Sequence, residues 1–158
     1  MKRNAFTMLE LVFVIVVIGI LASIAVPRFA ATRDDAQIAK GRSDVSAIRS
    51  SIVSERQTRL LQGSSSFVNQ LDDAALDTED ETLFDDNDSN IGNGGSLLQY
   101  GVVSKDANGH WMKTINATTY IYKIINVPVT FTYDSTVGKF DCNTSNATFG
   151  NQCKMLIN

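Results

Sequence analysis

The sequence contains a single histidine, His110, and two cysteines, Cys142 and Cys153. Hydrolytic triads need a histidine base, and most transition-metal sites need several histidine or cysteine ligands. The chain shows no Ser/His/Asp set, no glycine-rich phosphate loop and no run of metal ligands. We therefore predict that it is not an enzyme, and we interpret His110, which precedes Trp111, as a surface or partly packed residue of a strand.

Charge is absent from residues 11–26, which read LVFVIVVIGILASIAV. The apolar stretch from Phe6 to Val26 has 21 residues, about 30 Å as a helix, which is enough to cross a bilayer. Lys2 and Arg3 precede it, so the positive-inside bias predicts a cytoplasmic N-terminus and a periplasmic head. We therefore predict a single-pass protein of the inner membrane.

One acid, Glu10, stands at the front of this apolar run. A charge at the bilayer centre costs roughly 2.5–3.5 kcal/mol on insertion scales, and less nearer the interface. A nearby cation would remove most of that cost. Cleavage between Ala5 and Phe6 would create one, because the new amine of Phe6 would lie about one helical turn from Glu10, or face it from a neighbouring chain.

The segment 5–10, AFTMLE, is followed by a hydrophobic run that contains Gly19 and Pro27. This order of features resembles the class III signal of type IV pilins and type II secretion pseudopilins. The resemblance covers about residues 1–60. It departs from the family at Ala5, where a glycine is usual. Because alanine is still small, cleavage is expected to occur, although at a lower rate.

The resemblance implies that a prepilin peptidase cuts before Phe6, that the Phe6 amine is N-methylated, and that Glu10 neutralises the amine of another subunit. It also implies that the helix between Gly19 and Pro27 unwinds when the subunit leaves the membrane lipid for an assembly platform and a filament. The residues alone indicate close helix packing at Gly19 and a kink at Pro27.

An ordinary secretory signal peptide is the alternative for this N-terminus. Its small-residue cleavage site would be Ser23-Ile24-Ala25, and the mature chain would begin at Val26. We favour the prepilin-type signal, because Glu10 is unfavourable inside a secretory signal and the helical pattern continues past that site.

Residues 6–62 read as one long helix behind a leader peptide, residues 1–5. Residues 6–27 are apolar all round, which predicts a transmembrane or filament-core helix. Residues 28–62 are amphipathic, and their apolar positions should face the sheet of the same molecule. These positions are Ile38, Val45, Ile48, Ile52 and Leu60. Gly63 is predicted to end the helix as a left-handed cap.

Charge is unevenly distributed between this helix and the rest of the chain. From Arg28 to Arg59 there are seven cations and four anions, whereas from Gly63 onward there are twelve anions and five cations. The acidic part begins with a polar connector, residues 63–96, in which we predict a short helix over about 67–77 and a loop rich in Asn and Gly. An acidic head is a poor partner for nucleic acid, so no direct nucleic-acid binding is expected from it.

Residues 97–158 carry short β-branched and aromatic runs separated by turn residues, which predicts an antiparallel β-sheet head. Asn108-Gly109 predicts a hairpin turn, and the segment 134–138 predicts another. The fold class is therefore α+β, with a long N-terminal helix packed on a small sheet. We expect strands near 98–104, 110–115, 118–126, 128–133 and 137–142, and consider a further one at 153–157.

Cys142 and Cys153 lie near the C-terminus, and the periplasm is oxidising. A disulfide between them would resemble the disulfide-bounded C-terminal region of many type IV pilins. On a chain-entropy estimate it would stabilise the head by roughly 2–3 kcal/mol. Two free thiols or a metal pair are the alternatives, although no clustered histidine supports a metal.

An acidic loop partly matches a calcium-binding loop, because oxygen ligands at alternate positions suit a hard cation. Ile91 and Leu97 stand where an EF-hand loop has a glycine and a bidentate glutamate, so a solvated acidic loop is the simpler interpretation. Major pseudopilins bind calcium in a head loop, and the resemblance therefore keeps calcium as a candidate cofactor. Its candidate ligands are Asp85, Asp86, Asp88 and Asn90.

The resemblance implies a structural subunit that assembles with identical or related pilin subunits into a pseudopilus for type II protein secretion. The first alternative is a true type IV pilus, used for adhesion, twitching motility or DNA uptake. The short chain favours the secretion family, a disulfide favours the pilus, and a calcium site would favour a major pseudopilin. The alternative of another class is a membrane-tethered periplasmic binding module that never polymerises.

Overall fold

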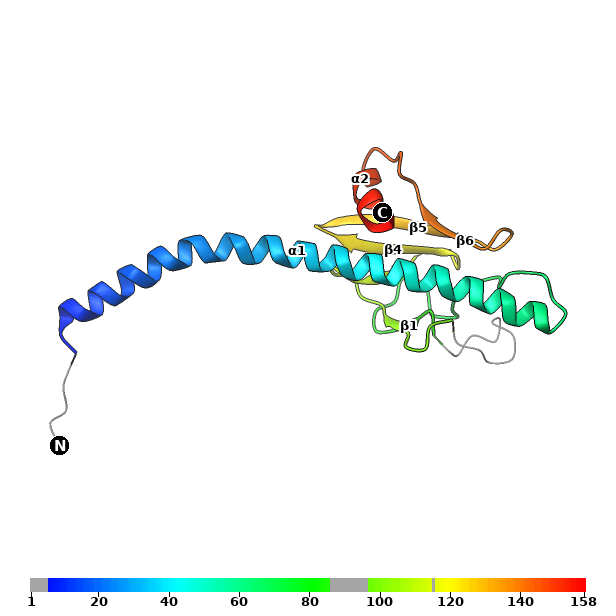
Figure 1. Ribbon diagram of the computed structural model, residues 1–158, viewed down its shortest axis with the longest axis horizontal. Coiled ribbons are helices and arrows are strands. Elements are labelled where there is room, and N and C mark those ends of the chain that lie inside the picture. Colours follow the sequence, from blue (N-terminus) through cyan, green and yellow to red (C-terminus); the bar gives the residue numbers. More distant parts are fainter. Residues whose placement is uncertain (1–5, 86–96, 115) are drawn as a thin grey trace, which may run out of the picture. The chain divides into compact units, whose positions relative to one another are not determined.

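A computed structural model describes residues 6–85, 97–114 and 116–158, with the backbone alone at 27–31. The chain divides into two compact units, Met1–Ala36 and Gln37–Asn158. The fold is α+β, as predicted, with an N-terminal apolar helix and a sheet head (Figure 1). The elements are α1 (Met8–Leu61), β1 (Thr82–Leu83), β2 (Val102–Val103), β3 (Trp111–Lys113), β4 (Thr119–Ile124), β5 (Val127–Asp134), β6 (Lys139–Cys142) and α2 (Gly150–Ile157).

The end of α1 is a glycine-based cap, as the sequence predicts. Gly63 has a φ of +88°, a conformation that glycine adopts without strain. The amide of Ser64 donates to the carbonyl of Arg59 at 2.9 Å, and that of Gly63 donates to the carbonyl of Leu60 at 3.1 Å. These are the paired bonds of a Schellman motif, and they stop the helix within two residues of the predicted end.

Strands β3 to β6 form an antiparallel sheet in sequential order. Across β4 and β5, Tyr120 pairs with Phe131 and Tyr122 with Val129, so alternate side chains share one face. The alternation predicted from the sequence is confirmed. The buried side chains on this face are Tyr120, Tyr122, Ile124, Val129, Phe131 and Tyr133.

The second half of α1 covers this face of the sheet. Val45, Ile48 and Ile52 are each at most 1% exposed and share one core with the strands. Ile38 is partly buried against the same core. Leu60 does not fit the prediction, because it is 49% exposed near the end of the helix.

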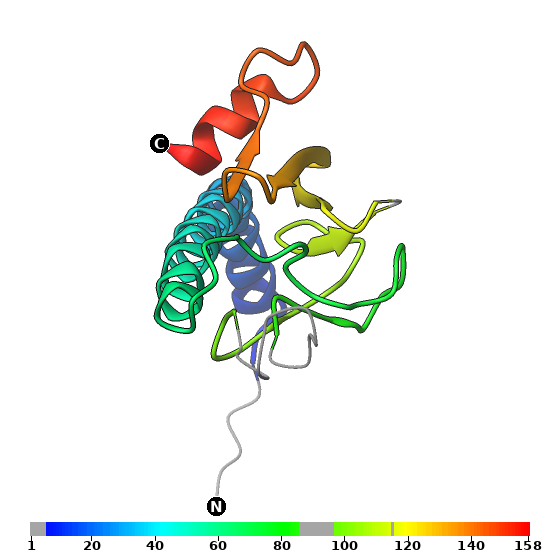
Figure 2. The same ribbon diagram turned by 90° about the vertical axis from the view of Figure 1, so that its right-hand side faces the viewer.

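Gly41 brings α1 close to both β4 and α2. A Cβ atom at this position would lie 2.6 Å from side-chain atoms of Tyr122 and Leu156, so only glycine allows this approach. Figure 2 shows α2, in red, beside the cyan part of α1.

The turn predicted at Asn108-Gly109 is present, but it does not join a hairpin. Gly109 has a φ of +79°, and the amide of His110 donates to the carbonyl of Ala107 at 3.2 Å. The strand expected over 98–104 is reduced to β2, which pairs with β1 rather than with β3. The physical reason is that Thr82–Leu83 of the connector forms hydrogen bonds with β2.

A second turn, between β4 and β5, is not apparent from the sequence. Ile125 and Asn126 have φ values of +49° and +60°, the mirror-image turn that matches the twist of a hairpin. Isoleucine is unfavourable in this conformation. Two bonds with Asn108 hold the turn, because its Oδ1 accepts from the amide of Asn126 at 2.9 Å and its Nδ2 donates to Asn126 Oδ1 at 2.8 Å.

The strand considered at 153–157 is wrong, because this segment belongs to α2. Gly150, Cys153 and Leu156 are buried and lie three residues apart. That spacing places them on one face of a helix, whereas a strand would need alternate positions.

The helix expected over 67–77 is also absent. The carbonyls of Asp72 and Ala74 accept hydrogen bonds from Lys113 Nζ at 3.1 and 3.0 Å. A side chain of another element therefore supplies the donors that backbone amides would supply in a helix. Asp77 has a φ of +52°, which a right-handed helix excludes.

A buried ion pair fixes the connector to β3. Lys113 Nζ lies 2.6 Å from Asp72 Oδ1, and the two side chains are 3% and 0% exposed. Asp72 Oδ2 accepts a further bond from the amide of Phe84 at 3.1 Å. With the two carbonyls of the connector, each proton of the ammonium group has an acceptor. The sequence predicts a polar connector around Asp72, and the burial of this side chain corrects that prediction.

Tyr133 also ties the connector to the sheet, and it should make the head sensitive to alkali. Its hydroxyl donates to the carbonyl of Val68 at 2.8 Å, and burial raises the pKa of Tyr133 from 10.0 to about 12. The folded state disfavours the tyrosinate, so this contribution to stability is complete below pH 10 and is lost as the pH rises towards about 12. We expect the free energy of unfolding, followed by Trp111 fluorescence, to fall over this range and to fall less in Tyr133→Phe. An equal fall in both proteins would contradict the assignment.

Candidate functional site

Thr7 and Glu10 form reciprocal hydrogen bonds at the start of α1. The amide of Glu10 donates to Thr7 Oγ1, and the amide of Thr7 donates to Glu10 Oε2, each at 3.2 Å. The Thr7 hydroxyl donates to the same carboxylate oxygen at 3.2 Å. This arrangement is a capping box, which satisfies backbone donors that the first turn of a helix leaves unpaired.

The capping box gives Glu10 a role within its own chain that was not predicted from the sequence. The signal was present in the spacing Thr7-x-x-Glu10 directly before an apolar helix. A carboxylate in the first turn is also favoured by the positive end of the helix dipole. Glu10 therefore has a local role that needs no other chain.

The surface that follows Glu10 is apolar and uncovered. Side chains from Phe6 to Val26 are exposed, except that of Ala25, which is half-buried. Met8–Val26 has a mean hydropathy of 2.9, with none of it buried, and is long and apolar enough to cross a membrane. An apolar surface of this extent needs lipid or other protein chains to cover it.

Helix α1 passes through positions 19 and 27 without a break in its helical backbone. A Cβ atom added at Gly19 would meet nothing within 4 Å. Packing inside the molecule therefore does not require glycine there, and the position is open to the close approach of another helix. Unwinding between Gly19 and Pro27 stays a prediction.

The residues of the predicted cleavage site are only partly described. Phe6 is 79% exposed, directly before the capping box, and Ala5 lies outside the described residues. The exposure of Phe6 is what access by a peptidase and a methylating enzyme would require.

The candidate calcium ligands are described only at Asp85, which is half-buried, while Asp86, Asp88 and Asn90 lie outside the described residues. In the part of the chain that the structure describes, no group of three or more His, Cys, Asp or Glu side chains is placed to hold a metal ion. Calcium binding stays a prediction.

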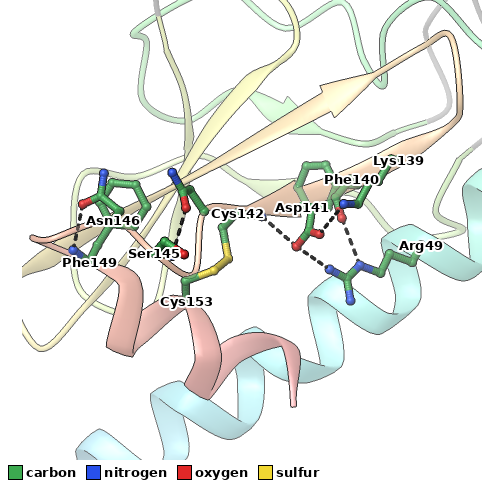
Figure 3. Close-up of a disulfide and its surroundings, with 10 residues drawn as sticks. Arg49, Lys139, Phe140, Asp141, Cys142, Ser145, Asn146, Phe149 and Cys153 are labelled. Carbon is green, nitrogen blue, oxygen red and sulfur yellow. Dashed lines mark hydrogen bonds and ion pairs between the residues drawn. A yellow bond between two sulfur atoms is a disulfide. The ribbon is translucent and has the colours of Figure 1, made fainter.

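Cys142 and Cys153 form a disulfide, with their Cα atoms 5.9 Å apart (Figure 3). The pairing implied by the resemblance is confirmed, and neither cysteine is a free thiol. The bond joins the end of β6 to α2. Asn146 lies between the two cysteines, and its Oδ1 accepts a bond from the amide of Phe149 at 3.2 Å, just before α2 begins.

Arg49 of α1 binds β6 beside this disulfide (Figure 3). Its Nε donates to the carbonyl of Phe140 at 2.9 Å, and its guanidinium lies 3.0 Å from Asp141 Oδ1. Lys139 Nζ lies 3.0 Å from the other oxygen of Asp141. One half-buried carboxylate therefore holds two cations at the junction of α1 and β6.

His110 is half-buried, as predicted. Burial lowers the pKa of His110, and the positive charges of Lys40 and Lys105 lower it further. These surroundings favour the neutral ring of a packed residue.

Comparison with known proteins finds similarity to part of this chain. Residues 1–26 match the model of the prokaryotic N-terminal methylation motif. The chain is 48% identical over 50 residues to the type IV narrow pilus major component PilA5 of Thermus thermophilus, which is 32% of this chain and 43% of that protein. It is 39% identical over 51 residues to the type II secretion system core protein G of Escherichia coli, which is 32% of this chain and 35% of that protein. No solved structure is significantly similar to it.

The matched stretches span less than half the length of either relative. One relative is named as a pilus component and the other as a component of a secretion system, so the similarity does not separate the two. Neither the methylation motif nor the apolar helix separates them. Through its N-terminal methylation motif, the chain therefore resembles the type IV pilin and pseudopilin family over about a third of its length.

Proposed function

We propose that this protein is a structural subunit of a type IV filament. The observation that carries the proposal is the apolar surface of Met8–Val26, none of which is buried in the molecule, with a single carboxylate in its first turn. In the precursor this surface would face membrane lipid. In the filament it would face the same surface of identical or related subunits.

Cleavage between Ala5 and Phe6 by a prepilin peptidase would prepare the subunit for assembly. Hydrolysis of that peptide bond leaves an amine on Phe6, and N-methylation keeps its positive charge. The bonds of the capping box use Glu10 Oε2, so Oε1 can receive the amine of a neighbouring subunit while the cap stays intact. Within a dry helix bundle an unpaired carboxylate is strongly disfavoured, so this pair would select subunits in the correct register.

The precursor would cross the inner membrane once. Lys2 and Arg3 favour a cytoplasmic N-terminus, which places the head in the periplasm, where the Cys142–Cys153 disulfide would persist. An inner-membrane assembly platform would then extract the subunit, with unwinding between Gly19 and Pro27 as the expected conformational change.

Two kinds of filament remain as candidates. The short chain favours a pseudopilus for type II secretion, and the disulfide that closes the C-terminal segment favours a cell-surface pilus. Deleting the gene and measuring both secreted protein and surface filaments separates them. Loss of secretion with unchanged surface filaments would identify the pseudopilus, and the reverse would identify the pilus.

Processing of the N-terminus provides the direct test of the proposed function. Co-expression with a prepilin peptidase should yield a detergent-solubilised chain that begins with N-methylated Phe6, as measured by intact mass and N-terminal sequencing. Ala5→Asp is the matched control and should retain the leader, because an acidic side chain replaces a small one at the cleavage site.

Other termini would contradict the proposal in different ways. A mature start at Val26 would identify an ordinary secretory signal peptide. An intact leader on a stable protein that electron microscopy never shows in filaments would identify a membrane-tethered module.

A further inference from the structure

The head carries a basic groove where α1, β6 and α2 meet. Adjoining hollows of about 340 and 380 Å³ share Arg49 and Ile157 in their walls. Val45 and Leu156 form an apolar floor in the first hollow, and Val53, 54% exposed, continues it in the second. The basic groove is defined here by Arg42, Val45, Arg49, Val53, Lys139 and Ile157.

The ionised side chains that line the groove are mostly cations. Arg42, Arg49 and Lys139 contribute three positive charges, and Asp141 contributes one negative charge. Asp141 is already paired with both Arg49 and Lys139, so the rim keeps a side-chain charge of about +2. The groove therefore suits an occupant with an apolar tip and negative charge around it.

The connector presents a surface of that description, which we call the acidic ridge, residues 73–81. Leu76 lies at its centre and is 45% exposed. Its acidic side chains are exposed, apart from the half-buried Glu81, and the acids are Asp73, Asp77, Glu79, Asp80 and Glu81.

Hydrogen bonds to the rest of the head hold the ridge in one shape. The amide of Asp77 donates to the carbonyl of Lys113, and that of Asp80 donates to the carbonyl of Ser104, each at 2.9 Å. The Ser104 hydroxyl donates to the carbonyl of Thr78 at 2.8 Å and accepts from the amide of Glu81 at 3.0 Å. A segment fixed in this way loses little conformational entropy when it docks.

The ridge cannot bind the groove of its own molecule. In Figures 1 and 2, α2 and the green segment that leads into β1 lie on different sides of α1. Two complementary surfaces at different places on one chain make a head-to-tail contact. A contact of this kind that does not close into a ring generates a helical filament.

From these observations we infer that the acidic ridge of one subunit docks into the basic groove of the next. Leu76 enters the apolar floor, and the acids of the ridge meet Arg42 and Lys139 at the rim. The inference rests on the proposed function and adds to it a contact between heads. The charged rim fixes which neighbour is accepted and in what register.

Charge reversal with rescue tests this inference in full-length protein under assembly conditions. The groove variant is Arg42→Glu with Lys139→Glu, and the ridge variant is Asp73→Lys with Glu79→Lys. These four side chains are exposed, so the head should remain folded, which circular dichroism and thermal unfolding can verify. We expect each variant alone to lower the filament fraction, measured by sedimentation and electron microscopy, by about tenfold, because like charges then face each other.

The variant carrying all four changes is the matched control. It restores opposite charges with their positions exchanged and leaves the net charge of the chain unchanged, so it should recover filaments. Folded single-surface variants that assemble as well as wild type, or a four-fold variant that does not recover, would overturn the contact. Wild-type protein that forms no filaments after correct processing would instead overturn the proposed function.

Discussion

Replacing Glu10 with valine is expected to abolish filament assembly while the head stays folded. The substitution removes the only carboxylate in the first turn of α1, so the amine of a neighbouring Phe6 would enter an apolar bundle without a counter-charge. The head lies in the second unit, Gln37–Asn158, and does not depend on this side chain. Electron microscopy of assembled material, with thermal unfolding of the head as a control, measures both effects.

Two further variants separate the charge of Glu10 from its role in the capping box. Glu10→Gln keeps a side-chain oxygen that can accept from the amide of Thr7, but it removes the charge. We expect it to block assembly as strongly as valine. Thr7→Val keeps the charge and removes the other half of the box, at a cost of about 1 kcal/mol to the helix, and it should still assemble.

The opposite pattern would contradict the electrostatic account. If Thr7→Val blocked assembly and Glu10→Gln did not, the helix cap would be the property that assembly needs. If filaments formed normally with Glu10→Val, the carboxylate would have no part in selecting subunits.

Replacing Lys113 with methionine is expected to destabilise the head by about 3–5 kcal/mol. The change leaves the carboxylate of Asp72, whose side chain is 0% exposed, without its ammonium partner. It also removes the donor to the carbonyls of Asp72 and Ala74. Urea unfolding of the detergent-solubilised chain, followed by the fluorescence of its one tryptophan, Trp111, measures the loss.

The double variant Lys113→Met with Asp72→Asn is the matched control. Asparagine keeps an oxygen that can accept from the amide of Phe84 and carries no charge. The double variant should therefore recover a large part of the stability that Lys113→Met loses. If the two proteins unfold at the same urea concentration, the loss comes from packing and missing carbonyl bonds rather than from a stranded charge.

The features that were predicted well from the sequence depend on residues that are close together in the chain. The order of a basic leader, Phe6, an early acid and an apolar run is local, and so is the alternation of β4 and β5. The cap at Gly63 also depends on one residue and its neighbours. Local chemistry of this kind is enough to recognise the N-terminal methylation motif and to predict the fold class.

The features that the sequence did not predict depend on partners far along the chain. Asp72 resembles a solvated acid until Lys113, 41 residues later, is known to enclose it. The turn at Ile125 breaks the usual preference for glycine and asparagine, and Asn108 compensates from outside the hairpin. By contrast, α2 was predictable, because Cys153 and Leu156 have the three-residue spacing of a helix. The prediction of a strand there overlooked that spacing.

The apolar helix of Met8–Val26 has a thermodynamic consequence for the proposed filament. Hydrocarbon tails of lipids are about as apolar as leucine, so transfer of this helix from bilayer to bundle changes little hydrophobic free energy. A subunit would then have nearly the same free energy in the membrane and in the filament. Small contributions from contacts at the helix tips and heads would decide which state is more populated. Such a filament could be extended or retracted with little mechanical work, and its subunits would return to the membrane when it disassembles.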